Sequence, residues 1–373
     1  MDKIIKNVLE ESGMNAGTKQ ELPEKHHKID DNLKNILKKR KAEIVVVGCG
    51  GAGNNTIARL MQVGIEGAKT VAVNTDAQDL LYTDADEKIL IGKDITEGLG
   101  SGANPKLGEA AAKESKETVK KALEGADMVF VTCGLGGGTG TGSAPIISEI
   151  SKKIGALTVA IVTLPFAMEG NHRANNAKIG LEKLEEVVDT LIIIPNDKLI
   201  EMVPDVSINT AFKVADEILV NAVKGIAELV TKPGLINLDF ADIRAVMGEG
   251  GMAMIGMGQS DTENRAYEAV QKALTNPLLE VDIDGASGAL INVSGGGDLT
   301  LKEAKEVVNT VTTRLSPDAK IIWGAMVQRE LGDSIRVLVI VTGVESPQIY
   351  SSDHTFKTEQ KKDIEQRLGI DFI

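Results

Sequence analysis

Aromatic residues and cysteines are scarce in this sequence. Of its 373 residues only 3% are aromatic, whereas 42% are hydrophobic, so the core must be built mainly from aliphatic side chains and methionine. The two cysteines, Cys49 and Cys133, stand in no Cys-x-x-Cys spacing, so neither a disulfide framework nor a zinc site is supported. We expect both to be small buried residues. The four histidines show no ligand spacing either, and no metal site made by the protein is predicted.

Long apolar runs are also missing. No stretch approaches the roughly 20 residues of a membrane-spanning helix, and the N-terminus lacks the apolar core of a signal peptide. We therefore expect a cytoplasmic protein with no direct membrane insertion. The net charge of −13 argues against nucleic acid as a main partner, because phosphate backbones attract basic surfaces.

Five apolar segments alternate with helical stretches in the first half of the chain. Near-continuous apolar strands of this kind predict an α/β fold, in which helices cover both faces of a parallel sheet. Ligands then bind in the loops at the strand ends. The predicted strands are Ile44–Val47, Thr70–Val73, Met128–Thr132, Leu157–Thr163 and Leu191–Ile194.

A long helix and a second set of elements follow. Apolar residues recur at three- and four-residue spacing from Ile208 to Leu229, and the Pro-Gly pair that follows would end a helix there. Beyond it the pattern predicts a smaller α+β domain. Its strands are expected at Ala289–Val293, Lys320–Val327 and Ile335–Val341, and its helices at Thr262–Ala273 and Leu301–Arg314.

The domain organisation that we predict has six parts. The length exceeds what one core usually supports, and the first 40 residues are rich in Lys, Glu and Asp without an apolar stripe. The parts are a flexible extension (1–40), a nucleotide-binding domain (41–206), a central helix (207–231), an α+β domain (232–345), a linker (346–362) and a partner-docking peptide (363–373).

Two glycine-rich loops, each directly after a predicted strand, are the most informative feature. They run from Gly48 to Asn55 (GCGGAGNN) and from Gly136 to Gly142 (GGGTGTG). Backbone N–H groups at a helix N-terminus bind anions, and two such loops in one domain indicate a polyphosphate. Glycine runs also serve as tight turns, and the first loop alone fits the weak Gly-x-Gly-x-x-Gly pattern of dinucleotide-binding proteins. No P-loop lysine motif is present, so we expect neutral donors and a Mg²⁺ ion held mainly by phosphate and water.

Two further segments are expected to border the phosphates. Asn74-Thr75-Asp76 follows the second predicted strand, and the segment from Gly98 to Asn104 precedes a helix that starts at Pro105. Asp76 and Asn104 have an alternative role, because both residue types cap helix N-termini.

These motifs together resemble the FtsZ family of prokaryotic tubulin homologues. The resemblance also includes Pro165-Phe166-x-x-Glu169-Gly170-x-x-Arg173 and Asn237-Leu238-Asp239-Phe240-Ala241-Asp242, and it extends from Glu43 to Gly343. It implies a tubulin/FtsZ-like Rossmann-type GTPase domain joined by a long central helix to a smaller α+β domain. It also implies GTP and GDP as ligands, GTP hydrolysis, and head-to-tail filaments that form the cytokinetic ring at mid-cell.

The resemblance assigns roles to individual residues around the nucleotide. Glu169 would accept from ribose hydroxyls, and Arg173 would pair with phosphate or with Glu169, unless the two form only a surface ion pair. Phe212 would stack on the purine, although without the resemblance it would be predicted as a residue of the hydrophobic core. Asp216 would accept hydrogen bonds from guanine. The implied GTP-binding residues are Gly51, Ala52, Gly53, Asn54, Asn55, Asn74, Asp76, Gly102, Ala103, Asn104, Gly138, Thr139, Gly140, Thr141, Glu169, Arg173, Asn196, Phe212 and Asp216.

Asn237, Asp239 and Asp242 are the catalytic residues that the resemblance implies. The central helix would start beside the base, and its about 22 residues would place its far end roughly 33 Å away. The two aspartates would therefore reach the γ-phosphate of a neighbouring subunit and not their own, so hydrolysis would require assembly. The alternative for Asp239 is a cap on the following helix.

The C-terminal peptide and two departures from bacterial sequences concern partners. Leu368, Ile370, Phe372 and Ile373 predict a peptide that docks on a partner, unless this tail packs on its own domain. The resemblance to the FtsZ family implies a membrane-associated SepF-like adaptor as that partner. Ala52 interrupts the glycine run of many bacterial members, and the tail lacks their Pro-Ala-Phe element, so the chain is more similar to archaeal members. Two other functions stay open: a tubulin-like filament for cell shape or DNA segregation, and a nicotinamide-dependent dehydrogenase built on the first glycine loop.

Overall fold

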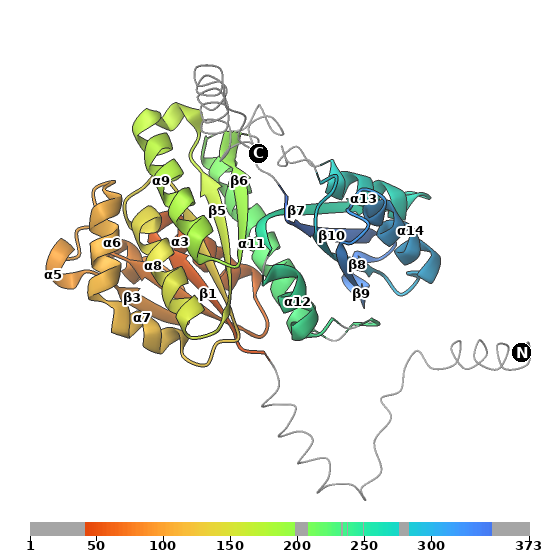
Figure 1. Cartoon of the computed structure of the whole chain (residues 1–373), viewed down its shortest axis with the longest axis horizontal. Helices are drawn as coiled ribbons and strands as arrows, with labels where there is room; N and C mark the ends of the chain where they lie inside the picture. The colour runs from red at the N-terminus through yellow and green to blue at the C-terminus, as the bar shows by residue number, and fades with distance from the viewer. Residues whose placement is uncertain are drawn as a thin grey trace, which may run out of the picture. The chain divides into compact units, whose positions relative to one another are not determined.

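The strands of this protein form one mixed sheet. The computed structural model describes residues 42–197, 208–232, 234–236, 238–248, 250–275 and 283–344. Within them the strand order is β3-β2-β1-β4-β5-β6-β7-β10-β8-β9, and Figure 1 shows helices on both sides of the sheet.

The first six strands are parallel and have the order of a Rossmann fold, 3-2-1-4-5-6. This arrangement confirms the predicted α/β class, and all five predicted strands are present. The strands are β1 (Ile44–Cys49), β2 (Ala68–Asn74), β3 (Glu87–Leu90), β4 (Met128–Gly134), β5 (Leu157–Leu164) and β6 (Thr190–Pro195). In this order, ligands bind outside the carboxyl ends of the strands.

Helices cover both faces of this parallel part. Ile44 and Val46 of β1 pack on one face with α3 and α11, whereas Val45 and Val47 pack on the other with α6, α7, α8 and α9. Because successive side chains of a strand point to opposite faces of the sheet, β1 contributes residues to two separate hydrophobic cores. The elements are α3 (Gly50–Val63), α4 (Ala77–Tyr82), α5 (Lys93–Thr96), α6 (Pro105–Glu114), α7 (Lys116–Leu123), α8 (Thr139–Lys153), η2 (Ala167–Glu169), α9 (Asn171–Val187) and α11 (Ile208–Thr231).

The second half of the chain continues the same sheet. β7 pairs in parallel with β6 over three residues, Thr190–Ile192 with Gly251–Ala253, and β10 is antiparallel to both β7 and β8. Its elements are α12 (Phe240–Met247), β7 (Gly251–Ser260), α13 (Arg265–Leu274), β8 (Gly288–Gly295), α14 (Leu301–Thr312), β9 (Lys320–Val327), η3 (Arg329–Leu331) and β10 (Ile335–Thr342). The three strands and two helices that we predicted here are confirmed within a few residues.

The central helix α11 joins the cores of the two halves. Leu219, Val223 and Ile226 belong to one buried cluster with α3 and with Leu338 and Ile340 of β10. The apolar three- and four-residue spacing of α11, which extends over 24 residues, therefore packs against both halves of the sheet.

Two strands, β3 and β7, were not predicted. β3 has only four residues, half of them charged, at the edge of the sheet. β7 is rich in glycine and methionine and has a single β-branched residue, Ile255, whereas most strands have several. Its glycines have a packing role: a Cβ on Gly256 or Gly258 would lie 2.0 Å from a carbonyl oxygen of α13, so only glycine lets this helix lie close to the strand.

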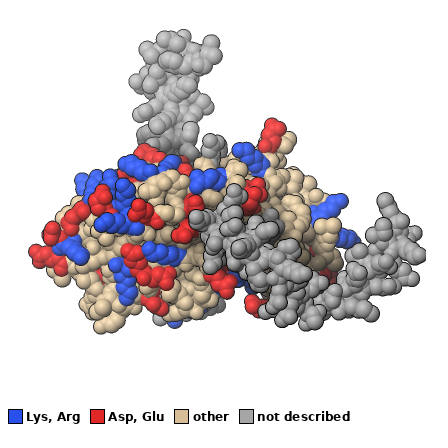
Figure 2. All heavy atoms as spheres, turned by 90° about the horizontal axis from the view of Figure 1, so that it is seen from below, with Lys and Arg blue, Asp and Glu red and all other residues tan. Residues whose placement is uncertain are grey.

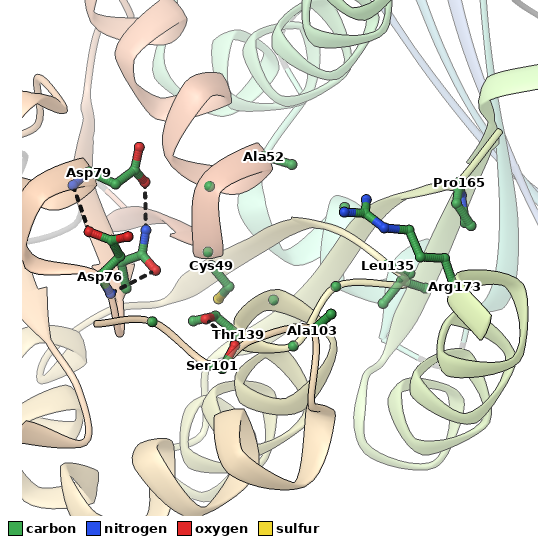
Figure 3. Close-up of a pocket in the computed structure, with 18 of the residues that line it drawn as sticks. Cys49, Ala52, Asp76, Asp79, Ser101, Ala103, Leu135, Thr139, Pro165 and Arg173 are labelled. Atoms are coloured by element: carbon green, nitrogen blue, oxygen red, sulfur yellow. Dashed lines mark hydrogen bonds between the residues drawn. The ribbon is translucent and has the colours of Figure 1, made fainter. Parts of the chain in front are cut away.

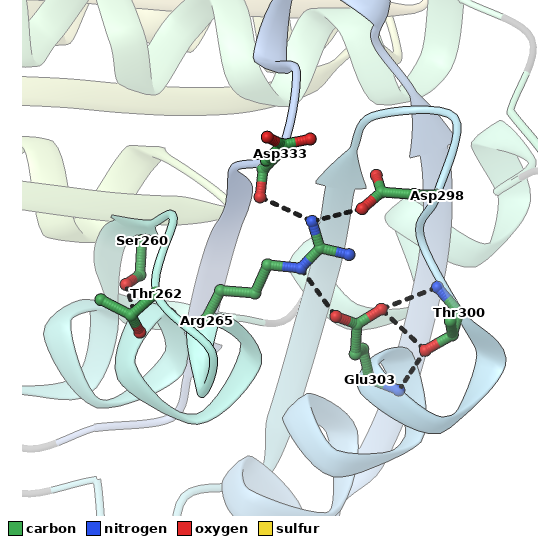
Figure 4. A network of polar contacts seen from close by, with 7 residues as sticks. All are labelled: Ser260, Thr262, Arg265, Asp298, Thr300, Glu303 and Asp333. Carbon is green, nitrogen blue, oxygen red and sulfur yellow. Dashed lines mark hydrogen bonds and ion pairs between the residues drawn. The ribbon is translucent and has the colours of Figure 1, made fainter.

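An ion-pair network joins the N-termini of α13 and α14 (Figure 4). The guanidinium of Arg265 donates to Asp298 and Glu303, each at 2.7 Å, and to the Asp333 carbonyl at 2.6 Å. Glu303 also accepts from the backbone and hydroxyl of Thr300 in a capping box. Burial raises the pKa of Glu303, but the hydrogen bonds from Arg265 and Thr300 outweigh it and lower this pKa to about 2.

We expect Glu303→Gln to lower the free energy of unfolding by about 3 kcal/mol at neutral pH. Because the folded pKa lies below the ordinary value of 4.5, this stabilisation is present above that value and is lost as the pH falls toward 2. Urea unfolding at several pH values measures it. The exposed Glu306 of the same helix gives the control, Glu306→Gln. A difference between wild type and Glu303→Gln that did not shrink in acid would contradict the prediction.

Acidic and basic side chains are interspersed over the face seen in Figure 2, so this face offers no continuous basic surface. Among the residues that the structure describes, no helix is both long enough and apolar enough to span a membrane.

Candidate functional site

A cavity of about 560 Å³ opens at the carboxyl edge of the parallel strands (Figure 3). Its wall includes Cys49 and Gly134, the last residues of β1 and β4, together with Thr163 near the end of β5. This is the edge at which the strand order reverses, between β1 and β4, and at which a Rossmann-type sheet binds its ligand.

Most of the predicted nucleotide-binding residues line this cavity. They come from seven separate segments of the chain, which the fold brings to one edge of the sheet. The predicted residues on the cavity wall are Gly51, Ala52, Asn74, Asp76, Gly102, Ala103, Gly138, Thr139, Gly140, Glu169, Arg173, Asn196 and Asp216.

Some predicted residues do not line the cavity. Gly53, Asn54, Asn55, Asn104 and Thr141 are absent from its wall. The Thr141 hydroxyl accepts from the Gly136 N–H at 2.9 Å, so it shapes the second glycine loop from within. The Phe212 side chain lies outside the described residues. A nucleotide contact by any of these residues stays a prediction.

The second glycine loop forms the N-terminus of α8. Gly138 is the N-cap and provides no side-chain cap, so the N–H groups of the first turn remain available to an anion. A Cβ on Gly142 would lie 2.1 Å from the Pro105 carbonyl oxygen, so glycine is needed there for α8 to pack closely against α6.

Three hydroxyl groups meet at the start of α8. Thr139 Oγ1 lies 2.6 Å from Thr75 Oγ1 and 2.9 Å from Ser101 Oγ, and all three residues are buried. Figure 3 shows Ser101 and Thr139 facing each other. The sequence predicted Thr139 as a ligand but assigned no role to the other two hydroxyls.

The segment after β2 carries an acidic residue that sequence reasoning missed. The carboxylate of Asp79 lines the cavity and accepts from the side-chain amides of Asn74 at 2.6 Å and Asn54 at 3.3 Å. Asp76 caps α4 by accepting from the N–H groups of Gln78 and Asp79.

Both capping alternatives are realised in the structure. Asp76 caps α4 while it also lines the cavity, and Asn104 caps α6 by accepting from the Lys106 N–H at 3.1 Å. A cap and a ligand contact can coexist for Asp76, because its second carboxylate oxygen is free of the cap.

Glu169 and Arg173 form an ion pair on the opposite wall. Arg173 Nη1 donates to Glu169 Oε2 at 2.6 Å, and Glu169 Oε1 accepts from the Phe166 N–H at 2.9 Å. In the structure Arg173 therefore pairs with Glu169, the second of the two partners that were predicted. Figure 3 shows the Arg173 side chain reaching from α9 toward the cavity.

Asp216 and Asn196 also line the cavity. Burial raises the pKa of Asp216 to about 6, although the nearby positive charge of Arg59 acts in the opposite direction. The buried Asn196 Oδ1 has no hydrogen-bond partner. A half-buried carboxylate and a buried, unpaired amide oxygen are groups that a ligand with N–H donors would satisfy.

The two cysteines are buried and free, as predicted. They lie opposite each other on β1 and β4, and burial raises the pKa of Cys49 to about 12. The Cys133 pKa is raised as well, again by burial. Both thiols are therefore protonated and unreactive at neutral pH.

The predicted catalytic aspartates lie at the opposite edge of the sheet. Asp239 caps α12 by accepting from the Asp242 N–H at 2.8 Å. Arg244 of the same helix donates to the carbonyls of Asp127 and Gly155, which stand just before the amino ends of β4 and β5. Neither aspartate lines the cavity, and Asn237 lies outside the described residues.

Comparison with known families and structures decides the identity of the fold. Residues 43–204 match the family model described as Tubulin/FtsZ family, GTPase domain, and residues 251–345 match FtsZ family, C-terminal domain. The chain is 63% identical to cell division protein FtsZ 1 of Methanocaldococcus jannaschii, over 92% of this chain and 94% of that protein. The chain belongs to the FtsZ family.

Solved structures agree with this membership. An empty FtsZ dimer from M. jannaschii has a TM-score of 0.81 and 65% identity, covering 84% of this chain and 92% of that chain. CetZ2 from Haloferax volcanii, a protofilament with bound GTPγS, shares the fold at 24% identity and a TM-score of 0.72, covering 87% of this chain and 99% of that chain. The predicted similarity to archaeal members of the FtsZ family is confirmed.

Membership of the FtsZ family settles the class of protein. The chain is a tubulin-like GTPase of the cell-division type, and the first glycine loop belongs to a GTPase domain and not to a nicotinamide-dependent dehydrogenase. GTP and GDP are the nucleotides of this domain.

Proposed function

We propose that this protein binds GTP in the cavity, polymerises head to tail, and hydrolyses GTP only where two subunits meet, in filaments that form the cytokinetic ring. The observation that carries the proposal is the separation of two groups of residues. The phosphate-binding loops lie at the carboxyl edge of the sheet, whereas Arg244 of α12, the helix that Asp239 caps, donates to the segments that enter the same strands at the amino edge.

The separation is too large for one subunit to use both groups on the same nucleotide. β4 and β5 have seven and eight residues, which at about 3.3 Å per residue puts the two edges more than about 20 Å apart. A neighbour stacked with its amino edge on the cavity would bring Asp239 and Asp242 to the phosphates. Such a contact joins two different surfaces and therefore extends into an open filament.

In the shared site the carboxylates of Asp239 and Asp242, together with Asn237, would position and polarise the attacking water. Phosphoryl transfer needs little beyond positioning and charge stabilisation. The cap that Asp239 makes on α12 supports this role, because it fixes the carboxylate at the start of a helix while the residue stays exposed.

The part of the cavity wall that carries Asp216 and Asn196 would hold the guanine base. Asp216 would accept from its N1–H and exocyclic amine, Asn196 would offer its unpaired oxygen to a base N–H, and Phe212 would stack on the ring. Glu169 would accept from ribose hydroxyls, with Arg173 holding its second oxygen or turning toward phosphate.

Mg²⁺ would accompany the phosphates. No group of three or more His, Cys, Asp or Glu side chains that could hold a metal occurs in the described part of the chain, so the ion would be held by phosphate and water. Asp76 and Asp79 fit this arrangement, since their carboxylates on the cavity wall can accept from water molecules of the ion.

The affinity for GTP should fall in acid because of Asp216. Its pKa is about 6 in the structure, and a guanine bound to its carboxylate would favour the ionised form. We therefore expect the Kd for GDP to be constant above about pH 7 and to rise up to about tenfold per pH unit below pH 6. Calorimetric titration from pH 5 to 8 measures this. Asp216→Asn, whose side chain cannot ionise, serves as the control, and its Kd should no longer rise below about pH 6.

The remaining parts of the predicted organisation belong to the proposal as well. The nucleotide-binding domain (41–206), central helix (207–231) and α+β domain (232–345) would act as one polymerising unit, flanked by the extension (1–40) and the linker (346–362). The docking peptide, with Leu368, Ile370, Phe372 and Ile373, lies outside the described residues. We propose that it recruits a SepF-like adaptor; deletion of 368–373 should abolish recruitment and spare the GTPase activity, and retained recruitment would contradict this.

The dependence of the GTPase rate on protein concentration tests the proposed function. We expect almost no turnover below a threshold concentration, and above it a rate that grows with the amount of polymer measured by light scattering. GTP binding should persist below the threshold. A constant rate per subunit down to concentrations at which the protein is monomeric would contradict a shared site.

A further inference from the structure

We propose that Thr75 and Ser101 are positioning residues which direct the hydroxyl proton of Thr139 toward a phosphate oxygen. The inference rests on the proposed binding of GTP in the cavity and adds two residues that would set its affinity. Its basis is the set of three hydrogen-bonded hydroxyls at the start of α8, two of which, those of Ser101 and Thr139, are shown in Figure 3.

The three hydroxyls come from three loops around the phosphate region. Thr75 follows β2, Ser101 precedes α6, and Thr139 is the first residue of α8. All three residues are at least nine-tenths buried, and Thr139 and Ser101 line the cavity. The close approach is built into the backbone: a Cβ on Gly138 would lie 2.3 Å from Ser101 Oγ, so glycine is required there to admit the serine.

The backbone also holds the two outer hydroxyls in place. The Thr75 carbonyl accepts from the Gly100 N–H at 3.2 Å and from the Thr96 hydroxyl at 3.3 Å, so Thr75 and the loop that carries Ser101 are tied together. The hydroxyl of Thr139 therefore meets a preformed pair of partners and does not have to order them when nucleotide binds.

Counting protons gives the direction of the hydrogen bonds among the three hydroxyls. Three hydroxyls carry three protons, and the two contacts among them use two. If Thr139 accepts from both neighbours, its own proton is the one left over. A phosphate oxygen is a stronger acceptor than a hydroxyl, so bound nucleotide favours this arrangement. Successive hydrogen bonds polarise one another, which makes Thr139 a better donor than an isolated threonine.

Nucleotide affinity in single variants is the first part of the test. We expect Thr139→Val to weaken GDP binding by about ten- to a hundredfold, and Thr75→Val or Ser101→Ala by about two- to tenfold. Thr75→Ser keeps the hydroxyl and should bind like wild type. Binding is measured by calorimetry with GDP and with a methylene-bridged GTP analogue, so that hydrolysis does not interfere.

A matched control separates this role from loss of packing. Thr132 is a buried threonine of β4 whose hydroxyl has no hydrogen-bond partner, and Thr132→Val should leave nucleotide affinity within about twofold of wild type. Thermal unfolding of each variant checks that the fold is intact. If Thr132→Val weakened binding as much as Thr75→Val, the effect of Thr75 would be packing and the inference would be wrong.

The double variants carry the decisive result. In the Thr139→Val background, Thr75→Val and Ser101→Ala should change the affinity by less than about twofold, because both act through the Thr139 hydroxyl. If the fold-change in affinity of each double variant instead equalled the product of its two single fold-changes, the inference would be wrong. The proposed binding of GTP in the cavity would still stand. A wild-type protein that bound no guanine nucleotide would instead overturn the proposed function.

Discussion

Asp239→Asn is expected to lower the GTPase rate of the assembled protein by at least about a hundredfold, while the affinity for GTP stays within about twofold. The carboxylate does not line the cavity, so its loss should leave nucleotide binding intact, whereas in the proposed shared site it would remove a group that acts on the neighbour's nucleotide. The same result is expected for Asp242→Asn. Phosphate release by polymer of known amount, together with calorimetry on dilute protein, measures both quantities.

The choice of asparagine separates catalysis from capping. Asp239 accepts the Asp242 N–H at the start of α12, and asparagine and serine cap helices about as well as aspartate, whereas alanine costs about 1 kcal/mol. If capping were the whole role, Asp239→Asn and Asp239→Ser would turn over GTP like wild type and only Asp239→Ala would be impaired. If the carboxylate acts on water, all three variants should be inactive.

Asp216→Ala is expected to remove most of the preference for GTP over ATP. A buried carboxylate that accepts two guanine N–H groups discriminates by up to roughly 10⁴-fold, because adenine leaves it unpaired. Without the carboxylate, the two purines differ only in weaker contacts, and we expect the ratio of affinities to fall to about tenfold or less. Competition of ATP and GDP for a fluorescent guanine nucleotide measures this ratio.

Glu217 offers the matched control for Asp216. It is the next residue of α11, it is also acidic, and it pairs with Arg59 at 3.1 Å without lining the cavity. Glu217→Gln should therefore keep the preference for GTP. Equal losses in the two variants would indicate that the charge of this helix, and not a contact with the base, selects the nucleotide.

The sequence predicts the parallel sheet and its ligand edge because the information there is local. Short apolar runs such as Met128–Thr132 are typical of buried strands, and glycine loops after them place phosphate donors at the carboxyl edge. β3 and β7 were not predicted because their residues have little intrinsic preference for strands. They become strands through tertiary packing, such as the contact of Gly258 with α13.

Part of the site could not be predicted for a related reason. The hydroxyl chain joins Thr75, Ser101 and Thr139, which are as far as 64 residues apart and share no motif. The role of Asp79 depends on the amides of Asn54 and Asn74 that converge on it in space. A spacing pattern cannot reveal a contact that only the folded sheet creates.

Complementation between two inactive variants tests the shared site most directly. Asp239→Asn keeps an intact cavity but lacks one of the two aspartates, Asp239 and Asp242, that form the acidic end of the subunit. Asp216→Ala keeps this acidic end, but at low GTP concentration its cavity binds no nucleotide. Mixed in equal amounts, they should regain about a quarter of the wild-type rate, because about one head-to-tail contact in four then joins an intact cavity to an intact acidic end. A mixture that co-assembled yet stayed as inactive as its components would show that each subunit must cut its own nucleotide.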